Sequence, residues 1–342
     1  MTKRALITGV TGQDGSYLAE FLLNEGYSVW GMYRRSSVDS HRERLTNLEG
    51  KIKLICGDLL DYHSLSQAVD ESKPHEIYNL AAQSDVRISF DQPYLTKEIN
   101  WFGVERLLDI AKEKVPSVKF YQASTSEMFG AVLETPQNEN TPFNPVSPYA
   151  KSKVLAHQAL ERERQNGLFA CSGILFNHES PRRGINFVTR KFTDGIARIK
   201  LGLPQRETGK DYLEMGNLNA QRDWGFSEDY VEAMWLMLQQ EKPEDFIIAT
   251  GETRTIKEFI ETAANYAGIK ISWNGEGVNE EGYDQGGKKI LSVNPKFFRP
   301  SEVNILKGDS SKARNVLGWK PKTTFEEMVK LMVQEDLKRL EN

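Results

Sequence analysis

The stretch Leu6-Ile-Thr-Gly9-Val-Thr-Gly12-Gln-Asp-Gly15-Ser-Tyr-Leu18 decides the fold of this 342-residue chain. Its glycines have the spacing G-x-x-G-x-x-G and stand between a β-rich run and a helical pattern. Such glycines allow a tight turn, close approach of the backbone to a pyrophosphate, and close packing of the following helix, whose N-terminus faces the anion. An ordinary turn between a strand and a helix is the alternative. The flanking elements favour a dinucleotide site, with Gly9, Val10, Thr11, Gly12, Gln13, Asp14 and Gly15 as predicted binding residues.

Short β-rich runs alternate with helical patterns through the first half of the chain. Alternation of this kind is typical of βαβ units that build a parallel, doubly wound sheet with helices on both faces. We therefore predict an α/β fold of the Rossmann type. The expected strands are Ala5–Thr8, Ser28–Tyr33, Lys53–Cys56, Glu76–Leu80, Lys119–Ala123 and Ala170–Leu175. The expected helices are Tyr17–Glu25, Ser64–Asp70, Leu95–Lys114 and Tyr149–Asn166.

The pattern changes after about residue 176, where the alternation ends. Further helices are expected at Asn186–Leu201 and Ser227–Gln240. Thr255 and Thr324 each stand three residues before a Glu, which is the capping-box arrangement at the start of a helix. The stretch Asn274–Lys289 is rich in Gly, Glu and Asn, and we predict an exposed loop there.

The segment Phe246–Thr250 is strand-like and is predicted to return to the first sheet. We therefore expect two domains made from discontinuous segments. We expect residues 1–176, to which 223–250 return, to form a Rossmann domain that binds the dinucleotide. Residues 177–222 and 251–342 are expected to form a smaller α/β lobe that binds the substrate.

Composition limits the class of partner and the compartment. The net charge is −4 and the isoelectric point is about 5.9, so we expect neither nucleic acid nor a membrane as a partner. No segment approaches the roughly 20 apolar residues that span a bilayer, and the apolar stretch after Arg4 breaks at Gly9, too early for a signal peptide. Cys56 and Cys171 lie in apolar runs and are predicted to be reduced core residues. These features predict a soluble cytoplasmic protein.

The end of the second predicted strand indicates which dinucleotide binds. A protein that binds NAD usually places Asp or Glu about 20 residues beyond the glycines, on the ribose 2′-hydroxyl. This chain has Arg34, Arg35, Ser36 and Ser37 at that place. Guanidinium groups fork around phosphate oxygens with charge-assisted hydrogen bonds, so they suit a 2′-phosphate. A solvated basic turn is the alternative, but the position favours NADP as the cofactor, and no metal is expected.

Two further strand ends fit the same site. An Asp follows the third strand, where its carboxylate can meet the adenine amino group, and small residues follow the fourth, where they let the backbone approach the cofactor. Ordinary strand-to-helix turns are the alternative, since Asp and Ser commonly cap helices. Agreement with the glycine-rich loop favours the dinucleotide site. The residues added to it are Asp58, Leu59, Leu80, Ala81, Ala82, Gln83 and Ser84.

A Tyr-x-x-x-Lys pair supplies the candidate for hydride chemistry. Ser147 and Pro148 are typical of an N-cap and a first helical position, so Tyr149 and Lys153 lie one turn apart on one helix face. A nearby ammonium favours phenolate and lowers the pKa of Tyr149, which makes it a base for a substrate hydroxyl. A surface helix pair of no chemical importance is the alternative. The predicted NADP fold beside it favours the catalytic interpretation.

Glu127 adds a carboxylate that a plain alcohol dehydrogenase does not need. It follows the fifth predicted strand, at the carboxyl edge where ligands sit in open α/β sheets. Thr125 and Ser126 beside it carry hydroxyls that can orient a substrate oxygen or relay a proton. An exposed loop Glu is the alternative. Together with the Tyr–Lys pair, Glu127 indicates redox chemistry combined with proton abstraction and elimination.

Several stretches resemble the extended short-chain dehydrogenase/reductase family and, within it, the dehydratases that act on GDP-mannose. The resemblance runs nearly end to end. In the first half it rests on Gly9–Gly15, Arg34–Ser37, Ala123–Glu127 and Tyr149–Lys153. In the second half it rests on Leu175–Gly184, Arg222–Trp224 with Asp229–Glu232, and Arg299–Glu302.

The resemblance implies an internal hydride transfer. Tyr149 would deprotonate the mannose C4 hydroxyl while the C4 hydride passes to NADP, with Lys153 holding the ribose and the phenolate. The 4-ketone then acidifies the C5 proton, which Glu127 would remove. Water would leave from C6 with help from Glu127 or Thr125, and the hydride would return to C6. The product is a GDP-4-keto-6-deoxy sugar, as in deoxysugar biosynthesis of the GDP-fucose or GDP-rhamnose type.

The same resemblance assigns binding roles and an assembly. Tyr94, His178 and Arg183 would complete the cofactor site. GDP-mannose would be held by Ser84, Thr125, Ser126, Glu127, Tyr149, Asn177, Lys191, Arg222, Arg299 and Glu302. The Arg34–Ser37 segment reaches a neighbouring subunit in this family, which implies a homo-oligomer, a tetramer or else a dimer.

One departure and two other function classes bear on this interpretation. Related dehydratases that act on dTDP-glucose carry Asp where this chain has Ser126, which points away from dTDP sugars. A GDP-sugar reductase of the same family would not need Glu127, and an epimerase would leave the C6 hydroxyl in place. A non-enzymatic NADP-sensing module would keep the glycines without needing Tyr149 and Lys153. The chain has Glu127, Tyr149 and Lys153 together, and this combination favours the dehydratase.

Overall fold

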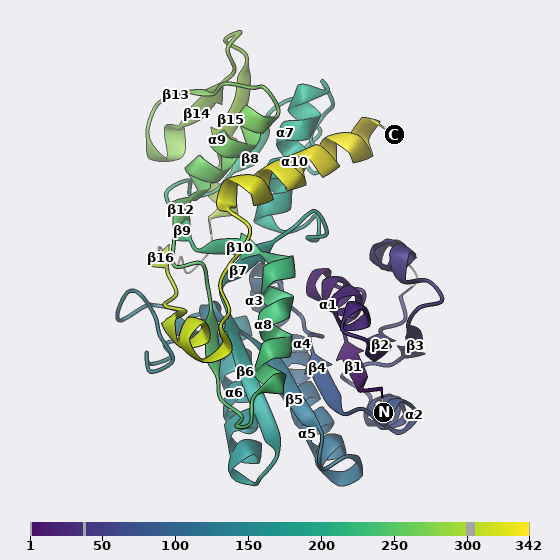
Figure 1. Cartoon of the computed structure of the whole chain (residues 1–342). Helices are drawn as coiled ribbons and strands as arrows, with labels where there is room; N and C mark the ends of the chain where they lie inside the picture. The colour runs from purple at the N-terminus through teal and green to yellow at the C-terminus, as the bar shows by residue number, and fades with distance from the viewer. Residues whose placement is uncertain (1, 37–38, 299–304, 342) are drawn as a thin grey trace.

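A seven-stranded parallel sheet is the centre of the larger part of the molecule (Figure 1). The structure is a computed structural model that describes residues 2–36, 39–298 and 305–341. The strands are β1 (Arg4–Thr8), β2 (Ser28–Tyr33), β3 (Lys53–Cys56), β4 (Glu76–Asn79), β5 (Lys119–Thr125), β6 (Phe169–Leu175) and β11 (Phe246–Ile248). They lie in the order β3-β2-β1-β4-β5-β6-β11, which reverses between β1 and β4. Open α/β sheets bind ligands at the carboxyl ends of the strands beside such a reversal.

Helices cover both faces of this sheet, and its inner strands bury side chains on both sides. Along β1, Ala5 and Ile7 join one apolar core and Leu6 joins the other, as the two-residue period of a strand requires. Helices α1 (Gln13–Asn24) and α8 (Ser227–Gln239) cover the first core. The second core lies beneath α2 (Tyr62–Ser72), α5 (Gly103–Lys114) and α6 (Pro148–Gln165). Two short helices, α3 (Val86–Asp91) and α4 (Pro93–Lys97), precede α5.

A second, smaller α/β unit fills the upper part of Figure 1. Its sheet has the order β13-β14-β15-β8 and shares an apolar core with three helices that pack on one another. These elements are α7 (Val188–Lys200), β8 (Leu213–Met215), α9 (Ile256–Tyr266), β13 (Ser272–Asn274), β14 (Glu281–Tyr283), β15 (Lys289–Val293) and α10 (Phe325–Glu341).

Two small sheets connect the two parts of the chain. One pairs β7 (Asn177–Glu179) with β10 (Trp224–Phe226) in parallel. The other joins β12 (Arg254–Thr255), β9 (Gln221–Arg222) and β16 (Ile305–Leu306). The buried carboxylate of Asp223, between β9 and β10, accepts hydrogen bonds from Thr250 and from the backbone N–H of Gly251. The end of β11 is therefore fixed to these small sheets.

The predicted fold class is confirmed, and β11 returns to the sheet beside β6 as expected. The capping boxes at Thr255 and Thr324 are both present. The division into two domains at the predicted boundaries stays a prediction.

Two details of the sequence analysis were wrong. Asn274–Lys289 is not a loop throughout, because β14 lies inside it and pairs with β13 and β15. The sequence did not indicate this sheet, because its strands are short and polar and are separated by turns that contain glycine. Cys56 is exposed and not a core residue, because β3 is the outermost strand of its sheet. Cys171 is buried, and both thiols are free. Among the described residues, the helices are all too short or too polar to cross a membrane.

Candidate active site

The glycine-rich loop joins β1 to α1 at the reversal of the sheet order. Gly9 has a φ of 70°, and a Cβ there would lie 2.9 Å from the backbone nitrogen of Ala81. A Cβ on Gly15 would lie 2.3 Å from the carbonyl oxygen of Gly9. Gly12, which has no side chain, is the N-cap of α1. The loop thus offers bare backbone at a helix N-terminus, an arrangement that fits the diphosphate of a dinucleotide.

The side chains of Gln13 and Asp14 face β7 and α8. Asp14 accepts hydrogen bonds from His178 Nε2 at 2.9 Å and from the Ser227 hydroxyl at 2.6 Å. Gln13 donates to the carbonyl oxygen of His178 at 3.1 Å and accepts from the Ser180 hydroxyl at 2.9 Å. These side chains therefore bind the start of α1 to the segment that follows β6. Within the loop, the N–H groups of Gly9, Val10 and Gly12 donate to backbone carbonyl oxygens of the protein.

A chain of buried polar side chains crosses the carboxyl ends of β1, β4 and β5. The Thr8 hydroxyl donates to Asn79 Oδ1 at 2.6 Å and accepts from the backbone N–H of Ala81 at 3.1 Å. Asn79 in turn donates to Gln122 Oε1 at 2.8 Å. Gln122 donates to the carbonyl oxygen of Ala123 at 3.0 Å. The chain links the strand below the glycine-rich loop to the strand that ends at Thr125.

The sequence analysis missed these three side chains. A signal for them exists, because Thr8, Asn79 and Gln122 are polar residues that each directly follow two fully buried apolar or aromatic residues of the same strand. Strands of a parallel sheet covered on both faces are usually continuously apolar. Polar residues at the carboxyl ends of such strands therefore mark positions that face the ligand edge or support it.

Tyr149 and Lys153 lie in the first turns of α6, where they were predicted. Ser147 caps the helix by accepting from the Ala150 N–H at 3.0 Å. The two side chains are buried, and the Lys153 ammonium lies 5.9 Å from the centre of the Tyr149 ring. Lys153 donates to the carbonyl oxygen of Ala123 at 2.9 Å.

Burial dominates the titration of both residues. It raises the pKa of Tyr149 to about 12, aided by the negative charge of Glu127 and opposed by a hydrogen bond with Thr125. It also lowers the pKa of Lys153 to about 8. The expected fall in the pKa of Tyr149 is therefore wrong for the protein by itself. Removal from water disfavours the phenolate more strongly than the surrounding charges favour it.

Glu127 and Thr125 lie beside Tyr149 at the carboxyl end of β5. Residues Ser126–Phe129 form a one-turn 3-10 helix, and Thr125 caps it by accepting from the Glu127 N–H at 3.2 Å. Ser126 is buried and Glu127 is half-buried. Thr125 also forms a hydrogen bond with Tyr149, and the negative charge of Glu127 acts on the same phenol, so the predicted carboxylate, hydroxyl and phenol gather at this end of β5.

The remaining predicted cofactor residues lie at neighbouring strand ends. Arg34 and Arg35 are exposed after β2. The Asp58 carboxylate accepts from the Leu60 N–H at 3.0 Å, and Gln83 donates to the Thr96 hydroxyl at 3.0 Å. Tyr94, on α4, is 85% exposed. The others are Ser36, which is exposed, Leu59, which is buried, Leu80, Ala81 and Ala82, which are partly buried, and Ser84, which is exposed.

The predicted substrate residues of the second half are spread over several elements. Asn177 begins β7, and Arg222 ends β9 with its guanidinium buried. Arg183, which was predicted to bind the cofactor, lies 3.8 Å from the centre of the Phe187 ring and 3.1 Å from the Glu179 carboxylate. Ser37, Arg299 and Glu302 lie outside the described residues.

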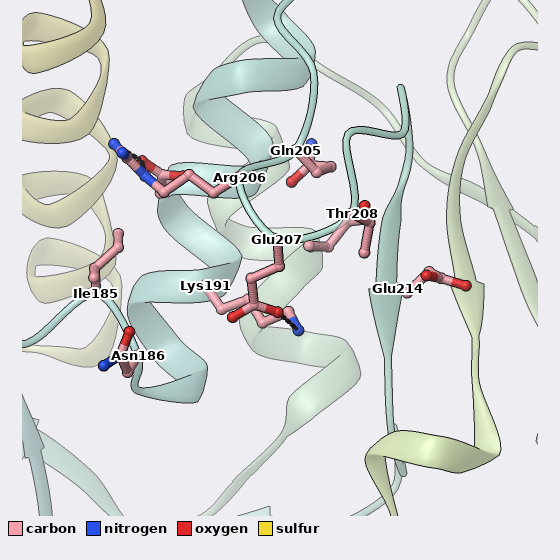
Figure 2. A pocket seen from close by; sticks show the side chains of 10 residues that line it. Ile185, Asn186, Lys191, Gln205, Arg206, Glu207, Thr208 and Glu214 are labelled. Atoms are coloured by element: carbon pink, nitrogen blue, oxygen red, sulfur yellow. Dashed lines mark hydrogen bonds and ion pairs between the residues drawn. The ribbon is translucent and has the colours of Figure 1, made fainter.

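Lys191 lines a pocket of about 70 Å³ between α7 and β8. Its ammonium pairs with the Glu207 carboxylate at 2.7 Å and lies 3.9 Å from the centre of the Phe297 ring. Figure 2 shows the Lys191 and Glu207 side chains meeting in this pocket, with Asn186 and Thr208 nearby. The pocket combines cations with amide, hydroxyl and carboxylate groups, which suits a polar ring.

One further cluster contains ligand-type atoms. His157, Glu161 and Asp245 bring a nitrogen and two carboxylate oxygens within 4.8 Å of one another. Asp245 also pairs with Arg164 and accepts from the Ser172 N–H at 2.7 Å. These ion pairs and hydrogen bonds, which join Asp245 to α6 and β6, account for the cluster without a metal. The expectation of no metal stays a prediction.

Comparisons with known proteins agree with this geometry. A family model described as GDP-mannose 4,6 dehydratase matches residues 6–332. The GDP-mannose 4,6 dehydratase of Cricetulus griseus is 51% identical over 98% of this chain and 91% of its own length. The enzyme of that name from Homo sapiens is 50% identical over 97% and 91%.

Solved structures with the same overall fold include epimerases of nucleotide sugars. UDP-glucose 4-epimerase from Thermotoga maritima, solved with UDP-glucose, matches with a TM-score of 0.82 and 25% identity over 98% of this chain and 99% of that one. The dTDP-glucose 4,6-dehydratase of Bacillus anthracis, solved with NAD, has a TM-score of 0.80 at 20% identity over 99% and 98%, a likeness of fold alone.

Proposed function

This chain belongs to the GDP-mannose 4,6-dehydratase family, and we propose that Tyr149, Lys153, Glu127 and Thr125 carry out its reaction. The protein is a hydro-lyase that converts GDP-mannose to GDP-4-keto-6-deoxymannose and water, with NADP as its cofactor. The observation that carries the assignment of residues is the meeting of Glu127, Thr125 and Tyr149 at the carboxyl end of β5.

The residues at the sheet reversal fit the cofactor. The backbone of Gly9–Gly15 and the N-terminus of α1 would hold its diphosphate, and Arg34 and Arg35 would hold the 2′-phosphate. When bound, NADP supplies the acceptor and donor for the hydride that leaves C4 and returns to C6. The buried pair of Tyr149 and Lys153 on α6 would lie beside its nicotinamide end.

Tyr149 takes the proton of the C4 hydroxyl in this proposal. The reaction requires the phenol to become a phenolate in a buried site, where its pKa in the protein alone is about 12. Lys153 lies on the same helix face and can stabilise that charge, and the hydrogen bond with Thr125 already favours it. We infer that Tyr149 is a neutral phenol until substrate and cofactor are in place.

Glu127 removes the C5 proton once C4 has become a ketone, because a neighbouring carbonyl acidifies that position. The half-buried carboxylate lies at the start of the 3-10 turn, next to the phenol that handles C4. Water then leaves from C6, and Glu127 or Thr125 supplies the proton. A reductase has no use for a base at this place.

The guanosine part of the substrate would extend from this edge toward the pocket at Lys191. The support for this is chemical, since the pocket lining combines the Lys191 cation with amide, hydroxyl and carboxylate groups. We propose that Asn177, Arg222, Arg299 and Glu302 complete the substrate site. We also propose that the protein forms a homo-tetramer or dimer, that it is located in the cytoplasm, and that its two domains are divided as predicted.

Incubation of the purified protein with GDP-mannose and NADP tests the function. Mass spectrometry should show a nucleotide sugar lighter by one water, and absorbance should show no net NADPH made or consumed. Stoichiometric NADPH consumption would identify a reductase instead. A product of unchanged mass would identify an epimerase.

A further inference from the structure

His178 is held between two acceptors at the point where β7 meets the start of α1. Its Nδ1 lies 2.8 Å from the carbonyl oxygen of Phe176, and its Nε2 lies 2.9 Å from Asp14 Oδ2. The ring stacks on Tyr230 with centroids 4.7 Å apart. The His178 and Asp14 side chains are only 11% and 21% exposed. The ring is thus fixed in one orientation by three partners.

These contacts decide the charge of the ring. A carbonyl oxygen is only an acceptor, so Nδ1 carries a proton, and an ionised carboxylate is also only an acceptor, so Nε2 carries one as well. Burial alone raises the pKa of Asp14, but the charge of His178 and the hydrogen bonds from His178 and Ser227 outweigh it and hold that pKa well below its usual range. Burial lowers the pKa of His178, and Asp14 reverses the direction, so that its pKa is raised. The pair is therefore imidazolium and carboxylate.

The position of Asp14 gives this pair a consequence. Asp14 lies in the first turn of α1, the helix whose N-terminus would face the cofactor diphosphate. A carboxylate there repels phosphate, and the repulsion is stronger in a site removed from water. Arg183, which pairs with Glu179 at 3.1 Å, also favours the ionised form of Asp14 by its charge, but His178 has the larger effect and is the cation in direct contact with Asp14. If no cation balanced its negative charge, Asp14 would weaken the attraction of the α1 N-terminus for phosphate.

We propose that His178 is a positioning residue whose fixed imidazolium cancels the charge of Asp14, so that the N-terminus of α1 can accept the phosphates of NADP. This inference rests on the assignment of the glycine-rich loop to NADP made above. It differs from a direct role for His178 at the nicotinamide, because both ring nitrogens already have protein partners.

A double-mutant cycle tests this inference by isothermal titration of NADP. His178→Gln keeps a donor but removes the charge, and we expect NADP to bind at least about tenfold more weakly. Asp14→Asn together with His178→Gln removes both charges and should restore the affinity to within about threefold. Asp14→Asn alone completes the cycle and measures any contact that Asp14 itself makes with NADP. The defect of His178→Gln should shrink at high salt, because salt screens charge.

Ser227→Ala is the matched control, since it removes a second hydrogen bond to Asp14 without a change of charge. A charge-balancing role predicts less than about a threefold effect on NADP affinity from this variant. Nitrogen-15 NMR of labelled histidine, with the His178 signal identified by its loss in His178→Gln, should show both ring nitrogens protonated at neutral pH. Circular dichroism and thermal unfolding check that each variant is folded.

Three results would overturn the inference. Equal NADP affinity of wild type and His178→Gln would show that the charge has no role. If the double variant does not recover NADP affinity, His178 has a structural role or contacts NADP directly. If the NMR spectrum shows a neutral His178 ring, the ring carries no charge that could balance Asp14. If wild type itself binds no NADP, the assignment of the loop fails first.

Discussion

Lys153 donates a hydrogen bond from its ammonium to the carbonyl oxygen of Ala123 at 2.9 Å, across the gap between α6 and β5. The same carbonyl accepts from the Gln122 side chain at 3.0 Å. Lys153 is 4% exposed, and the charge is therefore held in a place where water cannot solvate it. A catalytic ammonium kept in this way lowers the stability of the fold.

The first prediction concerns the stability of Lys153→Met. Burial lowers the pKa of Lys153 from 10.5 to about 8, so between these pH values the unfolded chain holds a proton that the folded chain has lost. The free energy of unfolding must then rise with pH in that window. The full shift corresponds to about 3 kcal/mol. Urea denaturation at pH 7 and pH 9.5 should show wild type gaining stability relative to Lys153→Met, which should be inactive.

Tyr149 does not interfere with this comparison, because its raised pKa affects stability only above its ordinary value and both variants contain it. Lys151→Met is the control, since Lys151 is exposed on the same helix. It should keep the wild-type dependence on pH. If Lys153→Met and wild type change in parallel, the ammonium is not desolvated.

The second prediction concerns proton abstraction. Glu127→Gln keeps the shape of the side chain but removes the base, so exchange of the C5 proton with deuterated solvent should fall by at least about a hundredfold. NADP affinity should stay within about twofold of wild type, since Glu127 has no proposed contact with the cofactor. NMR of the recovered nucleotide sugar measures the exchange.

Thr125→Val separates the two candidates for the C6 proton. If Thr125 supplies that proton, the variant should still exchange C5 but should release water slowly. Exchange that persists in Glu127→Gln would show that another group is the base. Thr125→Val with normal release of water would leave Glu127 as the donor.

The sequence predicted the parts of the site that depend on local signals. Pro148 and Ser147 place Tyr149 and Lys153 at the start of α6, because a cap and a first-turn proline act within a few residues. Parallel strands with both faces buried were found from their apolar runs.

The contacts that were not predicted join residues far apart in the chain. Asp14 and His178 are 164 positions apart, and in the sequence Asp14 looked like a cofactor ligand. The partner of Lys153 is a backbone carbonyl, which every residue has, so no residue type indicates it. Polar strand residues such as Asn79 gave a signal, but their pairing across β4 and β5 needs the register of the sheet.

The third prediction concerns Gly15→Ala. Its Cβ would lie 2.3 Å from the Gly9 carbonyl oxygen and 2.7 Å from Val10 Cα, both in the backbone of the loop. The loop must move, so we expect a loss of about 1–3 kcal/mol in unfolding free energy and at least about tenfold weaker NADP binding. Gly286→Ala, at an exposed turn where the nearest atom belongs to a flexible Asp284 side chain, should change neither. Unchanged NADP affinity in Gly15→Ala would place the diphosphate elsewhere.

The fourth prediction concerns the buried ion pair of Arg190 and Asp336, which joins α7 to α10. Arg190 Nε lies 3.1 Å from Asp336 Oδ2, and the two side chains are 8% and 2% exposed. Arg190→Met should lower the free energy of unfolding by about 3–5 kcal/mol, because it leaves the buried carboxylate with only the more distant Arg339, 3.8 Å away, as its cation. Arg190→Met with Asp336→Leu should recover much of that loss. Urea denaturation followed by circular dichroism measures both.

The dependence on pH identifies the cause of that loss. Burial raises the pKa of Asp336 even beside Arg190, so without the guanidinium it must rise further. The folded variant then holds a proton that the unfolded chain releases above its ordinary pKa near 4, and stability falls as pH rises through this range. Arg190→Met should therefore be less destabilised at pH 5 than at pH 7. An equal loss at both values, with no recovery in the double variant, would assign the effect to the hydrogen bonds from Arg190 to the carbonyl oxygens of Pro181 and Arg183.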